Sequence, residues 1–345
     1  MAKNEIKIIV NNKVYSELVE IQIVRDLDYL SSSFECVVAN RFIARSPIII
    51  EDQIEIKVNE EPVLTGFVDN IRMSISNNSH NFIISGNDVT ADLETSEIFA
   101  NATYKVENLK SLCESTIQDN GIFYISVIDN LEDDSFDKDK EQSGDTGQTI
   151  FSMLSEYALK QGKILTCNGE GDMVIYSNSG ISKGIVLENS SNNQLIKSAN
   201  LSQDFSNRYK KIIVKSQSDD DSDISGEASD SVVRREITKV IINESKIDAD
   251  GAKKIAEFEV NKRRSDSIQY NCKVFGFSAP NGELWKPNLL VSIIDSNAGI
   301  NATMLLKRVR YNFSQSDGST CDLTFVSEDA YSLKTEASQF NKGVE

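Results

Sequence analysis

Strict alternation of apolar and polar side chains dominates the first ninety or so residues. Every second residue is apolar from 19 to 23 and again from 54 to 58, and a period of two is typical of a half-buried strand. Polar turn-forming clusters separate these runs at short intervals, as at 11–12 and 31–33. Residues 1–95 are therefore predicted to form a small β-barrel or sandwich of consecutive hairpins.

The pattern becomes mixed over residues 96–200. Apolar residues from Val106 to Ile117 fall on one helical face, and Gly121 follows as a candidate C′ residue. A second helix is predicted over 149–161, again with a glycine directly after it. An acidic loop is expected between the helices, at 132–145, and strands over 163–167 and 173–176 close this mixed α/β domain.

Residues 201–345 return to strands, with two interruptions. The first is a run of Ser, Asp and Gly at 216–230 without apolar periodicity, which predicts a mobile loop. The second is a helix that begins near Asp248 and turns Ala252, Ile255, Ala256 and Val260 inward. A final β-region is expected over 267–326.

An internal repeat connects the two β-regions. Residues 64–88 and 305–329 have equal length, and in each segment two apolar runs flank a polar turn. Another β-run precedes each segment, but a gapless alignment leaves only three identical positions. Internal duplication and a shared hairpin geometry without common origin both explain this pattern.

The charge balance argues against a protein that grips nucleic acid. The chain has 36 basic and 53 acidic side chains, a formal net charge of −17. Its longest basic run is Lys262-Arg263-Arg264, expected on the solvated face of a helix, and duplex binding needs larger basic clusters. The hydrophobic fraction of 39% is that of an ordinary globular chain, which is expected to fold.

The five cysteines are widely spaced, and none forms a C-x-x-C pair. Neither a disulfide framework nor a zinc site is indicated, so we expect buried thiols and assembly in a reducing cytoplasm. The N-terminal segment lacks the apolar core of a secretory signal. Apolar runs also stay well short of the roughly 20 residues that cross a bilayer, so no direct membrane insertion is expected.

Catalytic patterns are missing from the sequence. His80, the single histidine, lies in a predicted strand, and no nucleophile elbow, Walker loop or dinucleotide fingerprint occurs. Glu94, Glu97 and Asp133 are candidate acids, but their neighbours are polar, whereas a glycosidase raises the pKa of one acid by burial. The run at 221–226 resembles the start of a calcium loop, but Val232 stands where the bidentate glutamate belongs. We expect no enzyme activity, no catalytic, cofactor-binding or metal-binding residues, and no cofactor.

Several discontinuous stretches together resemble the baseplate hub proteins of Mu-like contractile phages. They are VLTGFVD at 63–69 with GND at 86–88 and DL at 92–93, GKILT at 162–166, DFSNRY at 204–209, GELWKPN at 282–288 with LV at 290–291, and MLL at 304–306 with Val309. Each also has a structural reading: Gly66 relieves crowding between strands, and Trp285 is an aromatic anchor before a strand.

The resemblance implies a mainly β α+β fold with two tail-tube-like small β-barrel domains and an inserted mixed α/β domain. It also implies a homotrimer whose six β-domains form a pseudo-sixfold ring between the sixfold tail tube and the trimeric central spike. Further partners would be other baseplate proteins, with DNA only as passing cargo, and the location would be the baseplate of the virion tail. An acidic lumen that repels DNA would explain the net charge, as would solubility before assembly.

Two other classes of protein remain open at this point. One is a tail-associated peptidoglycan hydrolase, and the other is a β-rich glycan-binding adhesin subunit. The sequence also does not distinguish a phage from a defective prophage, a tailocin or another injection system.

Overall fold

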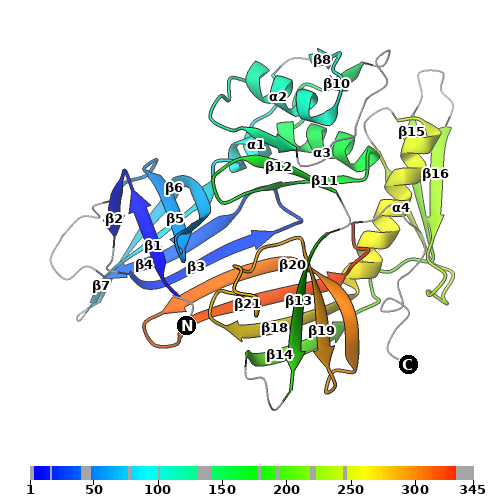
Figure 1. The fold of residues 1–345 in the computed structure, drawn as a ribbon. Helices are drawn as coiled ribbons and strands as arrows, with labels where there is room; N and C mark the ends of the chain where they lie inside the picture. The colour runs from blue at the N-terminus through cyan, green and yellow to red at the C-terminus, as the bar shows by residue number, and fades with distance from the viewer. Residues whose placement is uncertain are drawn as a thin grey trace.

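The computed structural model describes residues 4–15, 18–39, 48–76, 79–99, 102–129, 141–177, 180–190, 195–217, 223–243 and 247–331. Within these ranges the chain forms 21 strands and four helices, so the predicted mainly β α+β class is confirmed (Figure 1). None of the four helices is long and apolar enough to cross a bilayer.

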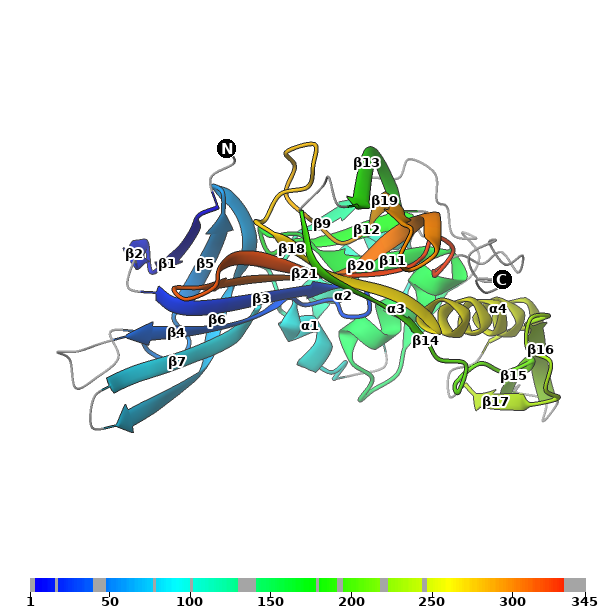
Figure 2. The ribbon, with the colours of Figure 1, turned by 90° about the horizontal axis from the view of Figure 1, so that it is seen from below.

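One large sheet of thirteen strands organises the molecule. Its N-terminal half consists of β1 (Ile6–Val10), β2 (Lys13–Tyr15), β3 (Leu18–Asp26), β4 (Ser33–Ala39), β5 (Gln53–Val58), β6 (Glu61–Ser76) and β7 (Ser79–Asp88). Its C-terminal half consists of β13 (Ile181–Asn189), β14 (Ile196–Gln203), β18 (Ile268–Phe275), β19 (Leu289–Asp295), β20 (Ile300–Ser314) and β21 (Gly318–Ser327). Figure 2 shows β3 beside β20 where the halves meet.

Both halves have the same strand order. It is β3-β4-β7-β6-β5 in the N-terminal half and β14-β18-β21-β20-β19 in the C-terminal half, and the strands follow one another along the chain in the same sequence. A sixth strand differs, since β1 is antiparallel to β5 whereas β13 is parallel to β19. The pairs among the described strands close neither half into a ring.

Matching β-bulges give the register of the repeat. The β6–β7 pairing shifts at Asp69 and the β20–β21 pairing at Lys307, while β3–β4 shifts at Val19 and β14–β18 at Lys197. Asp69 is therefore equivalent to Lys307, three positions away from the gapless alignment of 64–88 with 305–329. The gapless alignment is therefore displaced along the first strand. The hairpin turns also differ in length, since residues 76 and 79 pair in one hairpin and 314 and 318 in the other, so no gapless alignment matches both strands.

Alternating side chains of both halves fill one continuous apolar core. Trp285 is completely buried beside Tyr311, whose hydroxyl donates to the Trp285 carbonyl oxygen, as expected for an aromatic anchor before β19. Gly66 is required by close strand contact, because a Cβ atom there would lie 1.9 Å from the carbonyl oxygen of Asn87.

A mixed segment with its own core packs on one side of the sheet. It contains α1 (Ala91–Thr95), β8 (Ala102–Tyr104), α2 (Leu109–Asp119), β9 (Val127–Asp129), β10 (Gln142–Gly144), α3 (Ile150–Lys160), β11 (Lys163–Cys167) and β12 (Met173–Ser177). The two predicted helices are confirmed as α2 and α3, which begin after the side-chain caps Asn108 and Thr149. The expected loop at 132–145 is wrong at its end, where β10 pairs with β8; residues 130–140 lie outside the described residues.

A second insertion separates β14 from β18 and extends from the end of the C-terminal half (Figure 2). It contains β15 (Lys211–Gln217), β16 (Asp223–Ser229), β17 (Thr238–Ile242) and α4 (Ala249–Asp266), and α4 begins after the predicted cap Asp248. The predicted mobile loop at 216–230 is wrong where it overlaps β16, which pairs with β15, while 218–222 lie outside the described residues. Gly226 lets β16 approach α4, because a Cβ there would lie 2.1 Å from the Lys253 nitrogen.

A buried charge cluster holds this insertion to the sheet. Arg208 donates through Nε to the Asp230 carboxylate at 2.8 Å and through Nη1 to Ser267 Oγ at 3.3 Å. Arg264 Nη2 lies 3.6 Å from the other Asp230 oxygen, and all three charged side chains are at most 2% exposed. The expectation of a solvated basic triplet was therefore wrong for Arg264.

Replacing Asp230 by Asn should destabilise the protein strongly, because it removes the carboxylate that contacts two buried guanidinium groups. We expect a loss of about 3–5 kcal/mol in the free energy of unfolding, measured by urea denaturation. Glu227→Gln is the matched control, since it neutralises an exposed partner of Lys211 on the same small sheet. Equal midpoints for the two variants would contradict this role of Asp230.

Candidate assembly surface

The pairing of β3 with β20 joins the two halves of the sheet. It runs antiparallel from Asp26↔Arg308 to Glu20↔Ser314. Ile23 and Tyr311 face each other on the core side and are fully buried. On the opposite face Gln22 Nε2 donates to Asn312 Oδ1 at 3.2 Å, and Arg308 forms an ion pair with Asp26. The junction is thus continuous sheet, with apolar contacts on one face and polar contacts on the other.

Lys307, the bulge residue of β20, links this junction to α4. Its ammonium group lies 2.6 Å from both Asp28, which follows β3, and Asp266, at the end of α4, and its side chain is 8% exposed. Burial alone would raise the pKa of Asp28, but Lys307 and Lys262 hold that pKa below its usual value. Burial would lower the pKa of Lys307, yet the two carboxylates raise it.

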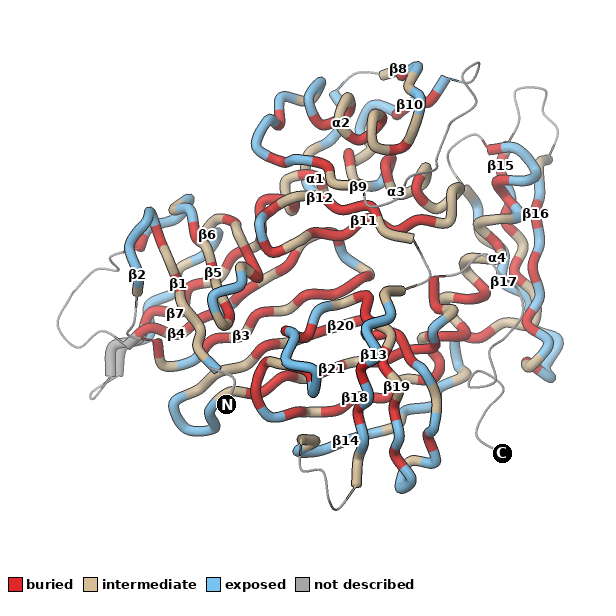
Figure 3. Tube along the Cα trace, viewed as in Figure 1, coloured by how far each residue is buried: buried red, intermediate tan, exposed pale blue. Residues whose placement is uncertain are grey.

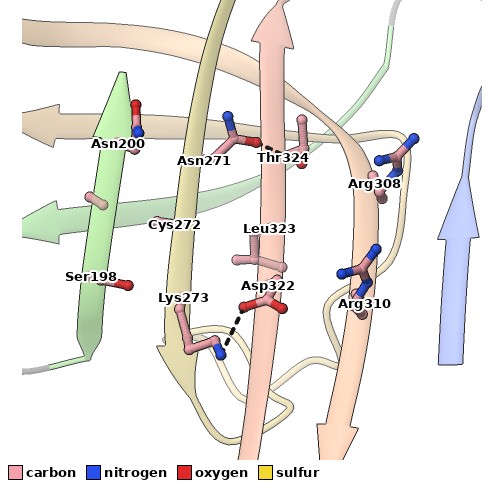
Figure 4. A pocket seen from close by; sticks show the side chains of 11 residues that line it. Ser198, Asn200, Asn271, Cys272, Lys273, Arg308, Arg310, Asp322, Leu323 and Thr324 are labelled. Atoms are coloured by element: carbon pink, nitrogen blue, oxygen red, sulfur yellow. Dashed lines mark hydrogen bonds and ion pairs between the residues drawn. The ribbon is translucent and has the colours of Figure 1, made fainter. Parts of the chain in front are cut away.

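The face of the sheet opposite the core is polar and shallowly hollowed. In the C-terminal half a rung of directly paired residues, Asn200, Asn271, Thr324 and Arg308, crosses β14, β18, β21 and β20. Figure 4 shows these side chains on neighbouring strands, with Thr324 Oγ1 donating to Asn271 Oδ1 at 2.8 Å.

The N-terminal half carries an equivalent rung. Its members are Gln22, Glu35, Ser85 and Asn70 on β3, β4, β7 and β6, and three of them line a second shallow hollow. The rung of the C-terminal half continues across the junction, because Arg308 pairs with Asp26 of β3. The rung of the N-terminal half ends at Asn70.

Charges on this polar face are mixed and not predominantly acidic. Side chains of both signs lie on it: Arg72, Lys273, Arg308 and Arg310 among the cations, and Glu20, Asp26, Glu35, Asp69 and Asp322 among the anions. Ion pairs connect several of them, such as Arg72 with Glu35 at 3.0 Å, Lys273 with Asp322 at 3.5 Å, and Arg308 with Asp26. The net negative charge of the chain is therefore not concentrated on this face.

Among the five strands that repeat in each half, two edges lack a partner in the described residues, in addition to the edges of β2, β13 and the small sheets. β14 pairs only with β18, and most of its residues are exposed (Figure 3). β6 pairs with β5 as far as Phe67, and beyond the bulge it pairs only with β7. Met73 is 53% exposed on this second part of β6. Unpaired edges present free backbone donors and acceptors and are sites where another strand can add.

The candidate catalytic residues are not brought together. His80 lies in β7, as predicted, and nothing is described of its side chain. Glu94 accepts a hydrogen bond from the Leu30 amide at 3.0 Å and so fixes a loop, Glu97 is exposed, and Asp133 lies outside the described residues. The described part of the calcium-like run belongs to strand β16, and no cluster of metal-ligating side chains occurs in the described ranges.

All five cysteines are buried and unpaired, as expected for core thiols. Burial raises the pKa of the Cys36, Cys167 and Cys272 thiols to about 12. A thiol with such a pKa is almost entirely protonated near neutral pH and is a poor nucleophile.

Sequence reasoning missed Lys307 and the two free edges. Lys307 follows the apolar run 304–306, and a charged residue directly after such a run was the available signal. A free edge depends on which strands find partners in the whole fold, so local sequence patterns do not reveal it.

Comparisons with known proteins agree on one kind of protein. Residues 5–88 match the N-terminal domain of the Mu phage baseplate assembly protein GpP-like family, and residues 248–334 match the fourth domain of GpP. The baseplate hub protein gp44 of Escherichia phage Mu is 24% identical over 310 residues, which cover 83% of this chain and 78% of that protein.

Two solved structures share the fold. The 43 kDa tail protein of prophage MuSo2 from Shewanella oneidensis has a TM-score of 0.81 at 24% identity, over 95% of this chain and 99% of the other. The tail protein from Neisseria meningitidis MC58 has a TM-score of 0.80 at 19% identity, over 94% and 97%. The fold is therefore that of phage tail proteins.

Within this class the two matched domains and the Mu relative make the chain a homologue of Mu-like baseplate hub proteins. The resemblance carried by its discontinuous sequence motifs is confirmed.

Lys307→Met should destabilise the fold by about 2 kcal/mol near pH 6, because Asp28 and Asp266 lose their shared cation. The folded pKa of Asp28 is depressed, so its contribution is complete above the unfolded value of about 3.9 and is lost as pH falls through the folded pKa. The difference from wild type in urea denaturation should therefore shrink below about pH 4. A difference that stays constant from pH 6 to pH 3 would contradict the assignment.

The native protein should resist thiol modification. At pH 8 a chromogenic disulfide reagent should detect almost no thiol in the folded chain and five per chain in guanidinium chloride, because all five side chains are buried. Rapid modification of one thiol in the folded protein would show that this part of the core opens readily.

Proposed function

We propose that this protein is the trimeric hub of a baseplate, an adaptor that joins the sixfold tail tube to the trimeric central spike. The observation that carries the proposal is the repeat of five strands in one order, β3-β4-β7-β6-β5 and β14-β18-β21-β20-β19, side by side in a single sheet. A chain with two similar units presents six units when three copies surround an axis. Such a ring matches a sixfold partner on one side and a threefold partner on the other.

The polar sheet face gives this ring a lining that suits passing DNA. Equivalent rungs cross both halves, so three copies would repeat the same polar pattern around the axis. Its mixed charge supports a lining without strong attraction for phosphate, and it argues against our hypothesis of an acidic lumen. In this proposal DNA passes through as cargo and is not bound.

The assignment as a structural component favours a protein without catalytic function. The buried thiols and the tethered Glu94 have structural contacts that account for them. The proposal places the mature protein in the tail baseplate after assembly in the host cytoplasm, with spike, tube and other baseplate proteins as partners. The division into domains at residues 95 and 200 also stays a prediction.

Light scattering over a range of protein concentrations tests the proposal. We expect a mass three times the 38.4 kDa of one chain, because the interface must be large and stable to carry the load of a tail. A monomer at every concentration would contradict the trimer.

Two activity assays separate the alternatives in the same preparation. Clearing of peptidoglycan in a gel that is lost on Glu94→Gln would favour a hydrolase. Binding of the isolated protein to cells or glycans would favour an adhesin. The hub proposal predicts neither activity.

A further inference from the structure

The two unpaired edges correspond to the two strands that already pair at the internal junction. Within the repeat, β14 is equivalent to β3, and β6 is equivalent to β20. β3 pairs with the part of β20 that follows its bulge, and the free edge of β6 is likewise the part that follows its bulge. The chain therefore contains one completed contact, β3–β20. It also contains the two strands, β14 and β6, that can form a second contact of the same kind with another copy.

From this equivalence we infer that β14 of one copy pairs antiparallel with residues 70–76 of β6 in the next copy, in the register of the internal junction. The bulges fix that register. Asp26 lies seven residues after the Val19 bulge, and Asp204 lies seven after the Lys197 bulge. Arg308 and Asn70 each directly follow the bulge of their own strand.

Each residue pair of the internal β3–β20 contact then has an equivalent pair in the contact between copies. Asp26↔Arg308 becomes Asp204↔Asn70, and Val24↔Arg310 becomes Ser202↔Arg72. Ile23↔Tyr311 becomes Leu201↔Met73, and Gln22↔Asn312 becomes Asn200↔Ser74.

Each pair expected between copies has side chains that suit the face of the sheet on which the pair lies. Ile23 and Tyr311 are apolar on the core side, and Leu201 and Met73 are apolar as well. Leu201 already packs at the margin of the core, and pairing would cover the exposed Met73. Gln22 and Asn312 share a side-chain hydrogen bond on the polar face, and Asn200 and Ser74 are both polar and exposed. The open rung that ends at Asn70 would continue into the next copy, as the other rung continues at Arg308.

This inference rests on the proposed trimer and adds the residues that make it. Because every copy offers one edge of each kind, the contact is heterologous and repeats around the ring until it closes. A second copy is therefore the occupant of both edges.

Disulfide cross-linking of Ser74→Cys with Asn200→Cys in one chain tests the register. Opposed residues of antiparallel strands have Cα atoms about 4.5–5.5 Å apart, within the range that a disulfide spans. Under mild oxidation we expect covalent bands at two and three times the chain mass on a non-reducing gel, and none above three. The five native cysteines are buried and should contribute little background.

Two matched double variants control for geometry. Gln22→Cys with Asn312→Cys tests the equivalent internal pair, which should link within one chain and leave the monomer band. Ser74→Cys with Ser202→Cys is displaced along β14 by two residues and should link much less, since diagonal neighbours lie about 7–8 Å apart. Stronger linking of the displaced pair would overturn the register.

A third variant tests the contact without cysteines. Met73→Asp would bury a charge in the interface and should raise the dissociation constant of the trimer by at least about tenfold. Met73 is half exposed in the single chain, so the unfolding temperature of the monomeric Met73→Asp variant should be close to that of the wild-type monomer. Ile242→Asp, on an exposed residue of β17, should leave the trimer intact.

The outcomes separate this inference from the proposed function. A trimer that forms normally while the Ser74 and Asn200 cysteines stay unlinked, although the internal control links, overturns the strand pairing and leaves the hub. A chain that is monomeric by light scattering and unlinked overturns both.

Discussion

The backbone pairing between β3 and β20 is the constraint on which the rest of the structure depends. Strand pairing fixes direction, spacing and register together, so once these two strands meet, the second half of the sheet has one position relative to the first. Ile23 and Tyr311 bury the core side of this contact. Lys307 then connects it to Asp28 and Asp266, which fixes the end of α4 to the same point.

The two faces and the edges of the continuous sheet have different roles. One face supplies a shared apolar core, and only strand residues line the two hollows of the second face among the described residues. That face can be polar because no described helix packs on these hollows. Edges remain because the described strands do not close into rings, and they are the parts of the sheet whose hydrogen bonds need another molecule.

The sequence predicts what local patterns determine and fails where distant contacts decide. Alternation predicts the strands, and the caps Thr149 and Asp248 mark two helix starts. β16 is polar along most of its length and forms a strand through its pairing with β15, while Gly226 lets α4 lie against it. Arg264 looks like a solvated charge until Asp230, far away in the sequence, provides its partner. The class of protein was predictable from scattered motifs, whereas the assembly edges follow only from the complete strand order.

The two equivalent strands differ in composition in a way that their positions explain. β3 has a paired strand along both edges and buries Ile21 and Ile23, whereas β14 presents mainly Ser, Asn and Gln, with Ile196 and Leu201 as its half-buried apolar residues. An edge strand that is exposed before assembly can pair with unrelated chains and cause aggregation. Polar side chains reduce the tendency to aggregate. The cost is a weak single contact, dominated by backbone hydrogen bonds. Closure of a ring offsets this weakness, because opening a closed trimer requires two such contacts to break before any copy can leave.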